Sequence, residues 1–304
     1  MFWFPLALLG ALSQATYSFS VKVLLRWIPP FLLAGYSFLA ASLVLFSLIL
    51  ASGIPPLGPG LVPAVAATVI INTVATILFY RALSTTDLSL CVPMLAFTPV
   101  FLILTSFVIL GEIPSPAGAF GIVLVAAGAF LLTRKSGHGQ SASLLTPFLT
   151  LRHDRGVRSM LIVAFLYSLS VNYDKEVVLN SSPLFGSALI LFLLAIIFLL
   201  IAVSAGTTWS FTAQEPDPVP SHPPFPYSRF FTVGAVGMML ALEGISINTA
   251  YTMAIVPYVI TIKRLSIFFS VLFGGLLLHE QYIRGRMFGA VVMIAGAVVI
   301  GLWG

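Results

Sequence analysis

Charged residues are scarce in this chain. They make up 8% of 304 residues, whereas hydrophobic residues make up 59%, and the mean hydropathy is +1.10. This composition excludes an ordinary soluble globular domain and indicates a chain that is solvated by lipid. Cysteine is rarer still, because Cys91 is alone in the sequence. An intramolecular disulfide and a thiolate metal site are therefore excluded.

Patterns that signal enzyme chemistry are also missing. The four histidines fall in predicted loops, and none lies at a ligand spacing from another. His279 and Glu280 do not begin an H-E-x-x-H zinc motif, because position 283 is isoleucine. The sequence contains neither an acidic pair at catalytic spacing nor a nucleophile beside a base. We therefore expect no catalytic residues, no metal site, no cofactor and no enzymatic activity.

Long uncharged runs dominate what is present. A hydrocarbon core of about 30 Å requires roughly 20 apolar residues per helix, so each such run is a predicted transmembrane helix. The fold class predicted is an all-α membrane protein with ten transmembrane helices. Their ranges are 3–21, 31–51, 61–80, 88–110, 117–133, 159–180, 184–205, 229–253, 257–278 and 286–303. Pro93 and Pro99 predict a kink in the fourth helix, whereas the ninth has Pro257 at its start.

The second half of the chain repeats the first. Glu112 and Gly121 recur 168 residues later as Glu280 and Gly289. Further matches are Gly128 with Gly296, Asn72 with Glu243, Tyr80 with Tyr251 and Lys22 with Lys175. Five helices per copy would make the second copy enter the membrane from the opposite side, so two inverted five-helix repeats are predicted. The domain boundaries predicted are 1–133 and 158–304, joined by a basic central loop, 134–157.

The basic residues are distributed by side. Loops that follow odd-numbered helices carry most of the Lys and Arg, which predicts a cytoplasmic central loop and external termini. We interpret these charges as topology signals and contacts with lipid headgroups, not as a nucleic-acid surface. The repeated glycines predict close helix packing, and Glu112 and Glu280 are expected to fix turns between helices.

Buried charge is concentrated in the second half. A charged side chain at the bilayer centre costs about 2.5–3.5 kcal/mol, so each one requires an explanation. Glu243 and Lys263 lie at similar depth on consecutive antiparallel helices. Four further charged residues complete a predicted ion-pair network: Asp174, Lys175, Glu176 and Arg264. Two interpretations stay open: a structural network, with Glu243 paired to Lys263 or Arg264, and a water-accessible cavity that binds a solute or a coupling proton.

Polar side chains at helical spacing support a lined cavity. Asn72 and Tyr80 share one face of the third helix, and Glu243 and Tyr251 share the matching face of the eighth. Gln14 belongs to a similar stripe on the first helix. Asn248 completes the predicted substrate-binding or coupling residues. For the neutral side chains, hydrogen bonding between helices is the alternative interpretation.

The sequences that close the two halves resemble a known family. They read L-G-E-I-P-S-P-A-G-A-F-G-I-V-L-V-A-A-G-A-F-L-L and L-H-E-Q-Y-I-R-G-R-M-F-G-A-V-V-M-I-A-G-A-V-V-I. With ten helices in two repeats, this pattern is similar to the EamA family of the drug/metabolite transporter superfamily. The resemblance implies a secondary transporter of small metabolites such as amino acids, often an exporter, with cytoplasmic termini. This last implication conflicts with the basic residues. His279 replaces the glycine of L-G-E in the second half.

These observations predict an alternating-access carrier that exports a small polar metabolite such as an amino acid or a related compound. Its expected partners are that substrate, a coupling proton as an option, and membrane lipid. The expected location is a prokaryotic inner membrane, in a multi-pass topology, as a monomer or a homodimer. A channel and a non-transporting scaffold or sensor are the alternatives.

Overall fold

The structure is a computed structural model. It describes residues 2–24, 28–85, 92–133, 154–205, 229–277 and 283–304. These residues form helices and contain no strand. The elements are α1 (Trp3–Leu24), α2 (Pro30–Ser52), α3 (Leu61–Thr85), η1 (Val92–Phe97), α5 (Thr98–Leu110), α6 (Pro116–Thr133), α8 (Arg155–Leu179), α9 (Pro183–Ala205), α10 (Arg229–Tyr251), α11 (Val256–Lys263), α12 (Ser266–Leu277) and α13 (Ile283–Trp303).

These elements make ten helical segments, at the positions that the apolar runs predict. The fourth segment consists of η1, which is a 3₁₀ helix, followed by α5. Pro93 lies in η1 and Pro99 in the first turn of α5, so the predicted departure from a straight α-helix is confirmed. Some predictions fall outside the described residues: those on the central loop 134–153, Cys91, His279 and Glu280.

The ninth segment is interrupted where no proline predicts it. It divides into α11 and α12, with Arg264 and Leu265 between them. The backbone N–H of Leu265 donates to the carbonyl of Ile262 at 3.0 Å, and that of Ile267 donates to the carbonyl of Arg264 at 3.0 Å. Bonds of this three-residue span tighten the backbone into a 3₁₀-like turn, which breaks the α-helix directly after Lys263.

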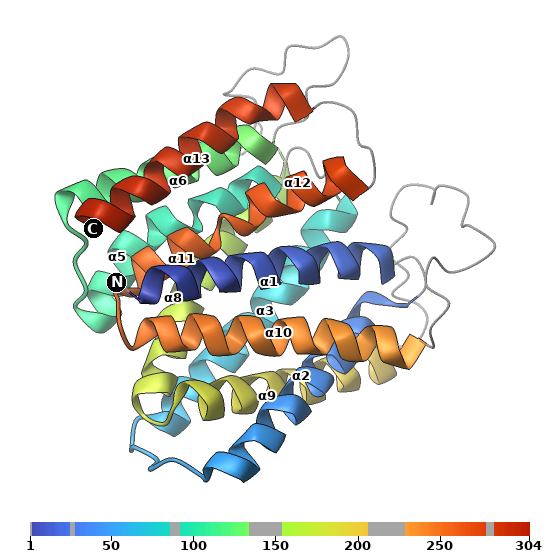
Figure 1. Ribbon diagram of the computed structural model, residues 1–304. Coiled ribbons are helices and arrows are strands. Elements are labelled where there is room, and N and C mark those ends of the chain that lie inside the picture. The colour runs from blue at the N-terminus through green and yellow to red at the C-terminus, as the bar shows by residue number, and fades with distance from the viewer. Residues whose placement is uncertain (1, 25–27, 86–91, 134–153, 206–228, 278–282) are drawn as a thin grey trace.

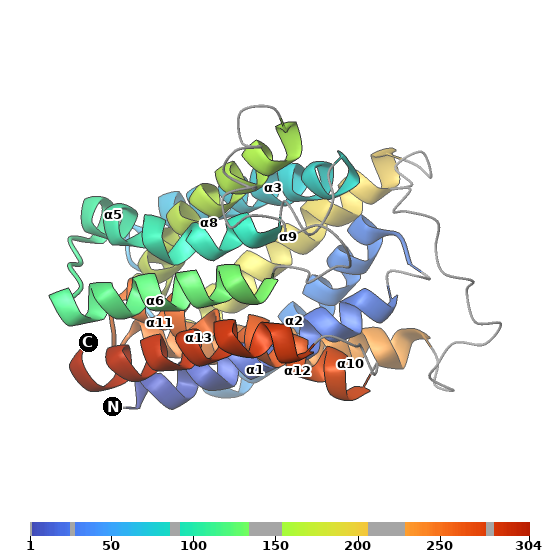
Figure 2. The same ribbon diagram turned by 90° about the horizontal axis from the view of Figure 1, so that it is seen from above.

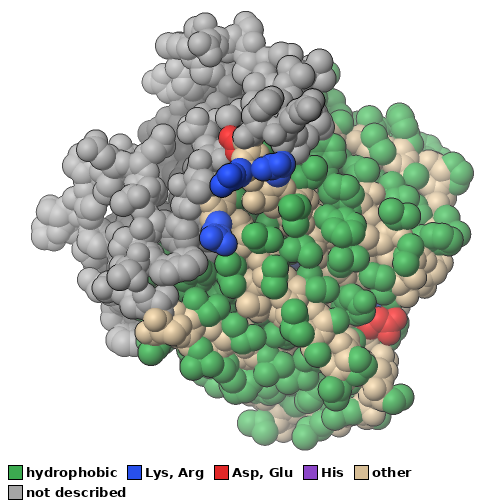
Figure 3. Space-filling model, turned by 180° about the vertical axis from the view of Figure 1, so that it is seen from behind, with side chains coloured by type: hydrophobic (Ala, Val, Ile, Leu, Met, Phe, Trp, Pro, Cys, Tyr) green, Lys and Arg blue, Asp and Glu red, His purple; other side chains and the backbone are tan. Residues whose placement is uncertain are grey.

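The apolar character of these helices is that of membrane spans. Five described helices are long and apolar enough to cross a bilayer, namely Pro30–Ser52, Leu61–Phe79, Arg155–Leu179, Pro183–Ser204 and Val233–Tyr251. Large hydrophobic side chains also face outward, including Leu50, Val62 and Val203. Figure 3 shows a face covered mainly by hydrophobic side chains, with few charged groups. The protein is therefore an integral, multi-pass membrane protein.

Each main helix contact pairs one helix from residues 1–133 with one from 154–304. α1 packs against α10, α3 against α8, α2 against α9, and α6 against α13. The same pairs lie side by side in Figures 1 and 2. The two termini lie near each other at one end of the bundle (Figure 1). The halves are therefore not separate bodies, and side chains from both meet along their shared interior.

The contact between α6 and α13 depends on the repeated glycines. A Cβ atom on Gly128 would lie 2.5 Å from the backbone nitrogen of Met293, and one on Gly121 would lie 2.9 Å from the carbonyl oxygen of Gly296. Gly289 and Gly296 meet the backbone of α6 equally closely. The predicted close packing at these glycines is confirmed, because an alanine at Gly128 would force the helices apart.

Candidate functional site

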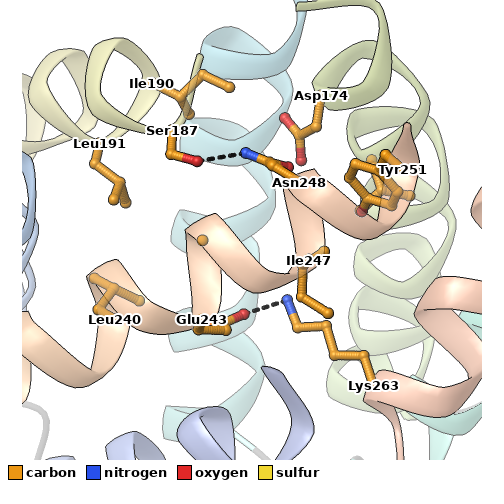
Figure 4. Close-up of a pocket in the computed structure, with 12 residues that line it drawn as sticks. Asp174, Ser187, Ile190, Leu191, Leu240, Glu243, Ile247, Asn248, Tyr251 and Lys263 are labelled. Carbon is orange, nitrogen blue, oxygen red and sulfur yellow. Dashed lines mark hydrogen bonds and ion pairs between the residues drawn. The ribbon is translucent and has the colours of Figure 1, made fainter. Parts of the chain in front are cut away.

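A cavity of about 130 Å³ lies among α8, α9, α10 and α11. Its polar lining residues are Asp174, Ser187, Glu243, Asn248, Tyr251 and Lys263. The rest of its wall is mainly aliphatic, formed by Val171, Ile190, Leu191, Leu240 and Ile247. Figure 4 labels all of these side chains except Val171 and shows the helices from which they come. All lining residues come from the second half of the chain, in which the buried charge is concentrated.

Glu243 and Lys263 form an ion pair on the cavity wall. Lys263 Nζ lies 2.5 Å from Glu243 Oε1 (Figure 4). The short turn between α10 and α11 makes the two helices antiparallel, which brings the two residues to the same depth, as the sequence predicts. The Glu243 side chain is 7% exposed and that of Lys263 is 27% exposed. Of the two candidate partners for Glu243, the structure selects Lys263.

Gln14, from the first half of the chain, also donates hydrogen bonds to the Glu243 carboxylate. The hydrogen-bonding environment orients its amide so that the nitrogen donates to both carboxylate oxygens of Glu243, at 2.9 Å each, while its carbonyl accepts from Ser18 Oγ at 3.2 Å. Gln14 lies on α1 and Glu243 on α10, which pack together. Both oxygens of Glu243 therefore have donors, and a charged hydrogen-bond network joins the two halves.

Asp174 has a different environment. Its Oδ1 accepts a hydrogen bond from Thr68 Oγ1 at 2.5 Å. Thr68 Oγ1 lies 2.9 Å from Ser170 Oγ, and Asn72 Nδ2 donates to that Ser170 oxygen at 2.6 Å and to Thr68 at 3.1 Å. Asn72 is thus placed behind Asp174 rather than on the cavity wall, and its observed partners are those of an interhelical hydrogen bond between α3 and α8.

Asn248 and Tyr251 occupy the far part of the same wall. Asn248 Nδ2 donates to Ser187 Oγ at 2.6 Å (Figure 4), which connects α10 to α9. Tyr251 is buried, with 2% of its surface exposed, and lines the cavity. The structure therefore brings together six of the predicted site residues around one space. Five line its wall, namely Asp174, Glu243, Asn248, Tyr251 and Lys263, and Gln14 joins them through its bonds to Glu243.

A second ion pair lies away from the cavity. Lys175 Nζ lies 2.6 Å from Glu112 Oε1 and donates to the carbonyl of Ala254 at 2.9 Å. Glu112 Oε2 accepts from Ser106 Oγ at 2.7 Å and from the backbone N–H of Val256 at 2.8 Å. We call these five residues the Glu112 clamp. The clamp ties the turn after α5 to α8 and to the turn between α10 and α11.

The clamp depends on a glycine. Gly111 ends α5 with a φ of +69°, in the left-handed region, and its N–H bonds to the carbonyl of Phe107. Most side chains avoid this conformation, so glycine fits here and lets the chain deliver Glu112 toward Val256. The prediction that Glu112 fixes a turn holds for the described half, since the carboxylate contacts two turns at once.

The remaining predicted residues lie elsewhere. Glu176 Oε2 accepts from Asn180 Nδ2 at 3.5 Å, at the end of α8. Arg264 lies in the break between α11 and α12, and its buried Nε has no hydrogen-bond partner among the described residues. The backbone of Tyr80 belongs to α3, but its side chain falls outside the described residues. The predicted network therefore divides, because Lys175 pairs with Glu112 and Asp174 faces the cavity.

Three neutral residues at the site were absent from the prediction: Thr68, Ser170 and Ser187. The spacing of Thr68 and Asn72, and of Ser170 and Asp174, is four residues in each case, which places each pair on one helix face. This signal could have identified the α3–α8 contact. In the described part of the chain, no three His, Cys, Asp or Glu side chains are grouped closely enough to hold a metal ion.

Two comparisons with known proteins found a similarity. Residues 1–134 match the model of the EamA-like transporter family. One solved structure, described as "Crystal structure of protein", aligns over 99% of this chain and 96% of its own length, with a TM-score of 0.74 and 16% identity. At that identity the likeness shows a common fold alone. No curated protein matched. Residues 1–134, which are less than half of the chain, are therefore similar to the EamA-like transporter family.

Proposed function

We propose that this protein is a secondary-active transporter that moves a small polar metabolite, such as an amino acid or a related compound, by alternating access. The observation that carries the proposal is the charged cavity among α8, α9, α10 and α11, inside a bundle whose outer surface is apolar. A charged group within a membrane protein is expensive to maintain and commonly marks a solute or ion pathway. Export from a prokaryotic cell across its inner membrane is the direction we propose.

The helix contacts support two inverted five-helix repeats. If helices one to five correspond to helices six to ten, the contact of α1 with α10 corresponds to the contact of α8 with α3. The contacts of α2 with α9 and of α6 with α13 then correspond to themselves. A pseudo-twofold axis in the membrane plane produces this pattern, and rocking of the two repeats about their shared interface is a common route to alternating access.

We propose that the Glu243–Lys263 pair is the element with which substrate, or a coupling proton, competes. Each partner is held by the other at 2.5 Å, and Lys263 is 27% exposed at the cavity. A solute that brings its own charge can replace one partner without leaving the other uncompensated. The break after Lys263 gives α11 an end that can move relative to α12, since a short 3₁₀ stretch within a helix commonly marks a hinge. Asn248 and Tyr251 supply hydrogen-bonding groups on the same wall.

The experiment begins with purified protein in a neutral detergent. A thermal-stability screen of amino acids, amines, carboxylates and sugars identifies a compound that raises the melting temperature. Its labelled form is then tested for uptake into proteoliposomes. We expect Glu243→Gln and Lys263→Met each to reduce uptake at least about tenfold, the factor for 1.4 kcal/mol. Glu176→Gln, which removes the same charge type outside the cavity, should retain it. Unchanged uptake in both cavity variants would overturn the assignment of this pair.

A channel is the first alternative function, and the same vesicles separate it from a carrier. A carrier accelerates the entry of labelled solute when unlabelled solute is loaded inside, and its rate saturates. An open pore gives neither effect. A scaffold or sensor would show stabilisation by the compound without uptake.

A further inference from the structure

The two carboxylates that face the cavity, Glu243 and Asp174, differ in their partners. Only one of them has a basic partner, so the other is available to a solute. Glu243 is engaged by Lys263 Nζ at 2.5 Å and by both hydrogen bonds from Gln14 at 2.9 Å. Asp174 accepts from the Thr68 hydroxyl. Among the described residues, no Lys or Arg nitrogen lies within 4 Å of the Asp174 carboxylate.

The charges at the cavity do not balance. Three lining residues are ionisable carboxylates or amines: Asp174, Glu243 and Lys263. One positive charge cannot neutralise two negative charges, and Lys263 is already paired with Glu243. Lys175, the basic residue next to Asp174 on α8, is held by the Glu112 clamp. An unpaired carboxylate in a low-dielectric interior is costly, so a cation supplied from outside is the partner that this arrangement favours.

The side chains around Asp174 indicate that this cation also has an apolar part. Val171 lies one turn before Asp174 on α8, and Ile190 and Leu191 face the same cavity from α9. These aliphatic side chains would pack against an apolar body, while the carboxylate holds the charged end. A carboxylate-bearing solute would instead have to displace Glu243 from Lys263, whereas a cation can bind Asp174 without displacing a basic side chain.

Resting on the proposed transport function, we propose that Asp174 is the residue that binds the ammonium group of the substrate, and that the substrate class is small aliphatic amines. The amine forms a charge-assisted hydrogen bond to Asp174. Thr68 holds the carboxylate from the other side and is itself fixed by Ser170 and Asn72. An amino acid would be recognised through its amino group.

The test is a matched series of probes on the unmodified protein. Butylamine, butanol and pentanoate share a short aliphatic chain and differ in charge. They are titrated in phosphate buffer, which contains no competing amine, with thermal stability and equilibrium binding as readouts. We expect butylamine to bind about tenfold or more tightly than butanol, as a hydrogen bond to a charged group allows, and pentanoate not to bind. Tighter binding of pentanoate than of butylamine would overturn the proposal.

Two variants localise the effect. Asp174→Asn keeps the shape of the side chain and removes its charge, so butylamine affinity should fall about tenfold or more. Glu176→Gln removes a charge from the same helix outside the cavity, and affinity should be unchanged. Retention of affinity in a folded Asp174→Asn protein would overturn the assignment. Stabilisation on lowering the pH, with no response to any amine, would overturn it in favour of a proton as the occupant.

A transport arm keeps this inference separate from the proposed function. Butylguanidinium stays charged at neutral pH and keeps N–H donors for Asp174, so it does not cross the bilayer as a neutral amine and its counterflow in proteoliposomes reports on the protein. Binding of the cation through Asp174 without counterflow would contradict transport and leave the binding assignment standing. Counterflow of pentanoate without counterflow of butylguanidinium would contradict the assignment and leave transport standing.

Discussion

Two lysine–carboxylate pairs of nearly equal length lie in different surroundings. Lys175 and Glu112 are 2.6 Å apart, and Lys263 and Glu243 are 2.5 Å apart. The first pair is fixed by backbone groups of Ala254 and Val256. The second is fixed by an amide side chain, Gln14, and faces a cavity. The length of an ion pair therefore does not distinguish structure from function, whereas the identity of the surrounding partners does.

Backbone partners cannot change their polarity, and side-chain partners can. The Val256 N–H only donates and the Ala254 carbonyl only accepts, so the Glu112 clamp requires the acid and the base where they are. The amide of Gln14 can rotate to present either its nitrogen or its oxygen. We infer that the clamp holds the fold and that the Glu243–Lys263 pair is the one that can exchange partners with a solute.

Exchanging the acid and the base within each pair is expected to give the largest difference in stability between the two pairs. In Glu112→Lys/Lys175→Glu, the new lysine meets the Val256 N–H and the new glutamate meets the Ala254 carbonyl, so we expect a loss of stability of about 3 kcal/mol or more. In Glu243→Lys/Lys263→Glu, rotation of Gln14 should restore a pair and recover about 1 kcal/mol or more relative to Glu243→Lys alone. Thermal unfolding in detergent measures both. Equal recovery at the two sites would contradict the distinction.

Neutralising the carboxylate of each pair is expected to give the next largest difference in stability. Glu112→Gln leaves Lys175 without its carboxylate at a site where it is 12% exposed, and should destabilise the protein by about 3 kcal/mol. Glu243→Gln leaves Lys263 at 27% exposure beside the cavity, and the loss should be smaller, about 1–2 kcal/mol. Glu176→Gln is the control for both. A greater loss at Glu243 than at Glu112 would reverse our interpretation.

Gln14 is expected to have a moderate effect. Gln14→Leu removes both hydrogen bonds to Glu243 and should reduce stability by about 1.5 kcal/mol, the lower range for a bond to a charged group. Ser18→Ala, which retains those bonds, serves as the matched control in the same unfolding assay. If the two variants melt alike, Gln14 does not hold the carboxylate.

The smallest effect on stability is expected for a substitution at Tyr258. The Tyr258 hydroxyl accepts a hydrogen bond from the Ser115 N–H at 2.8 Å. Tyr258→Phe should reduce stability by about 1 kcal/mol, the typical value for one hydrogen bond, and should leave amine binding unchanged. Altered binding would mean that the cavity and the clamp are coupled, against the separation that we infer.

The sequence predicted the cavity pair because its partners are joined by a short turn. Depth counted along α10 and α11 is enough to place Glu243 beside Lys263. Partners across the two halves could not be paired in this way. Lys175 is 63 residues from Glu112, and Thr68 is 106 residues from Asp174, so their contacts depend on how the helices pack. Helical spacing identified polar faces, but not which face meets which.

The break in the ninth segment also escaped prediction, and the reason is physical. Prolines signal the departure from a straight helix at η1, since each lacks a backbone donor. The residues at the break carry normal backbone donors, and the N–H groups of Leu265 and Ile267 bond over a three-residue span, to Ile262 and Arg264. Ordinary side chains leave no signal for such a change. The positions of all ten segments, in contrast, follow from apolar length alone.

The most direct test of the account compares butylamine affinity after the same substitution at the two pairs. We predict that Glu243→Gln, which removes one of the two negative charges at the cavity, weakens butylamine binding about tenfold, the equivalent of 1.4 kcal/mol. Glu112→Gln should leave the affinity of the folded protein within about twofold, because the Glu112 clamp does not line the cavity. Weaker binding in Glu112→Gln, with full affinity in Glu243→Gln, would contradict the account.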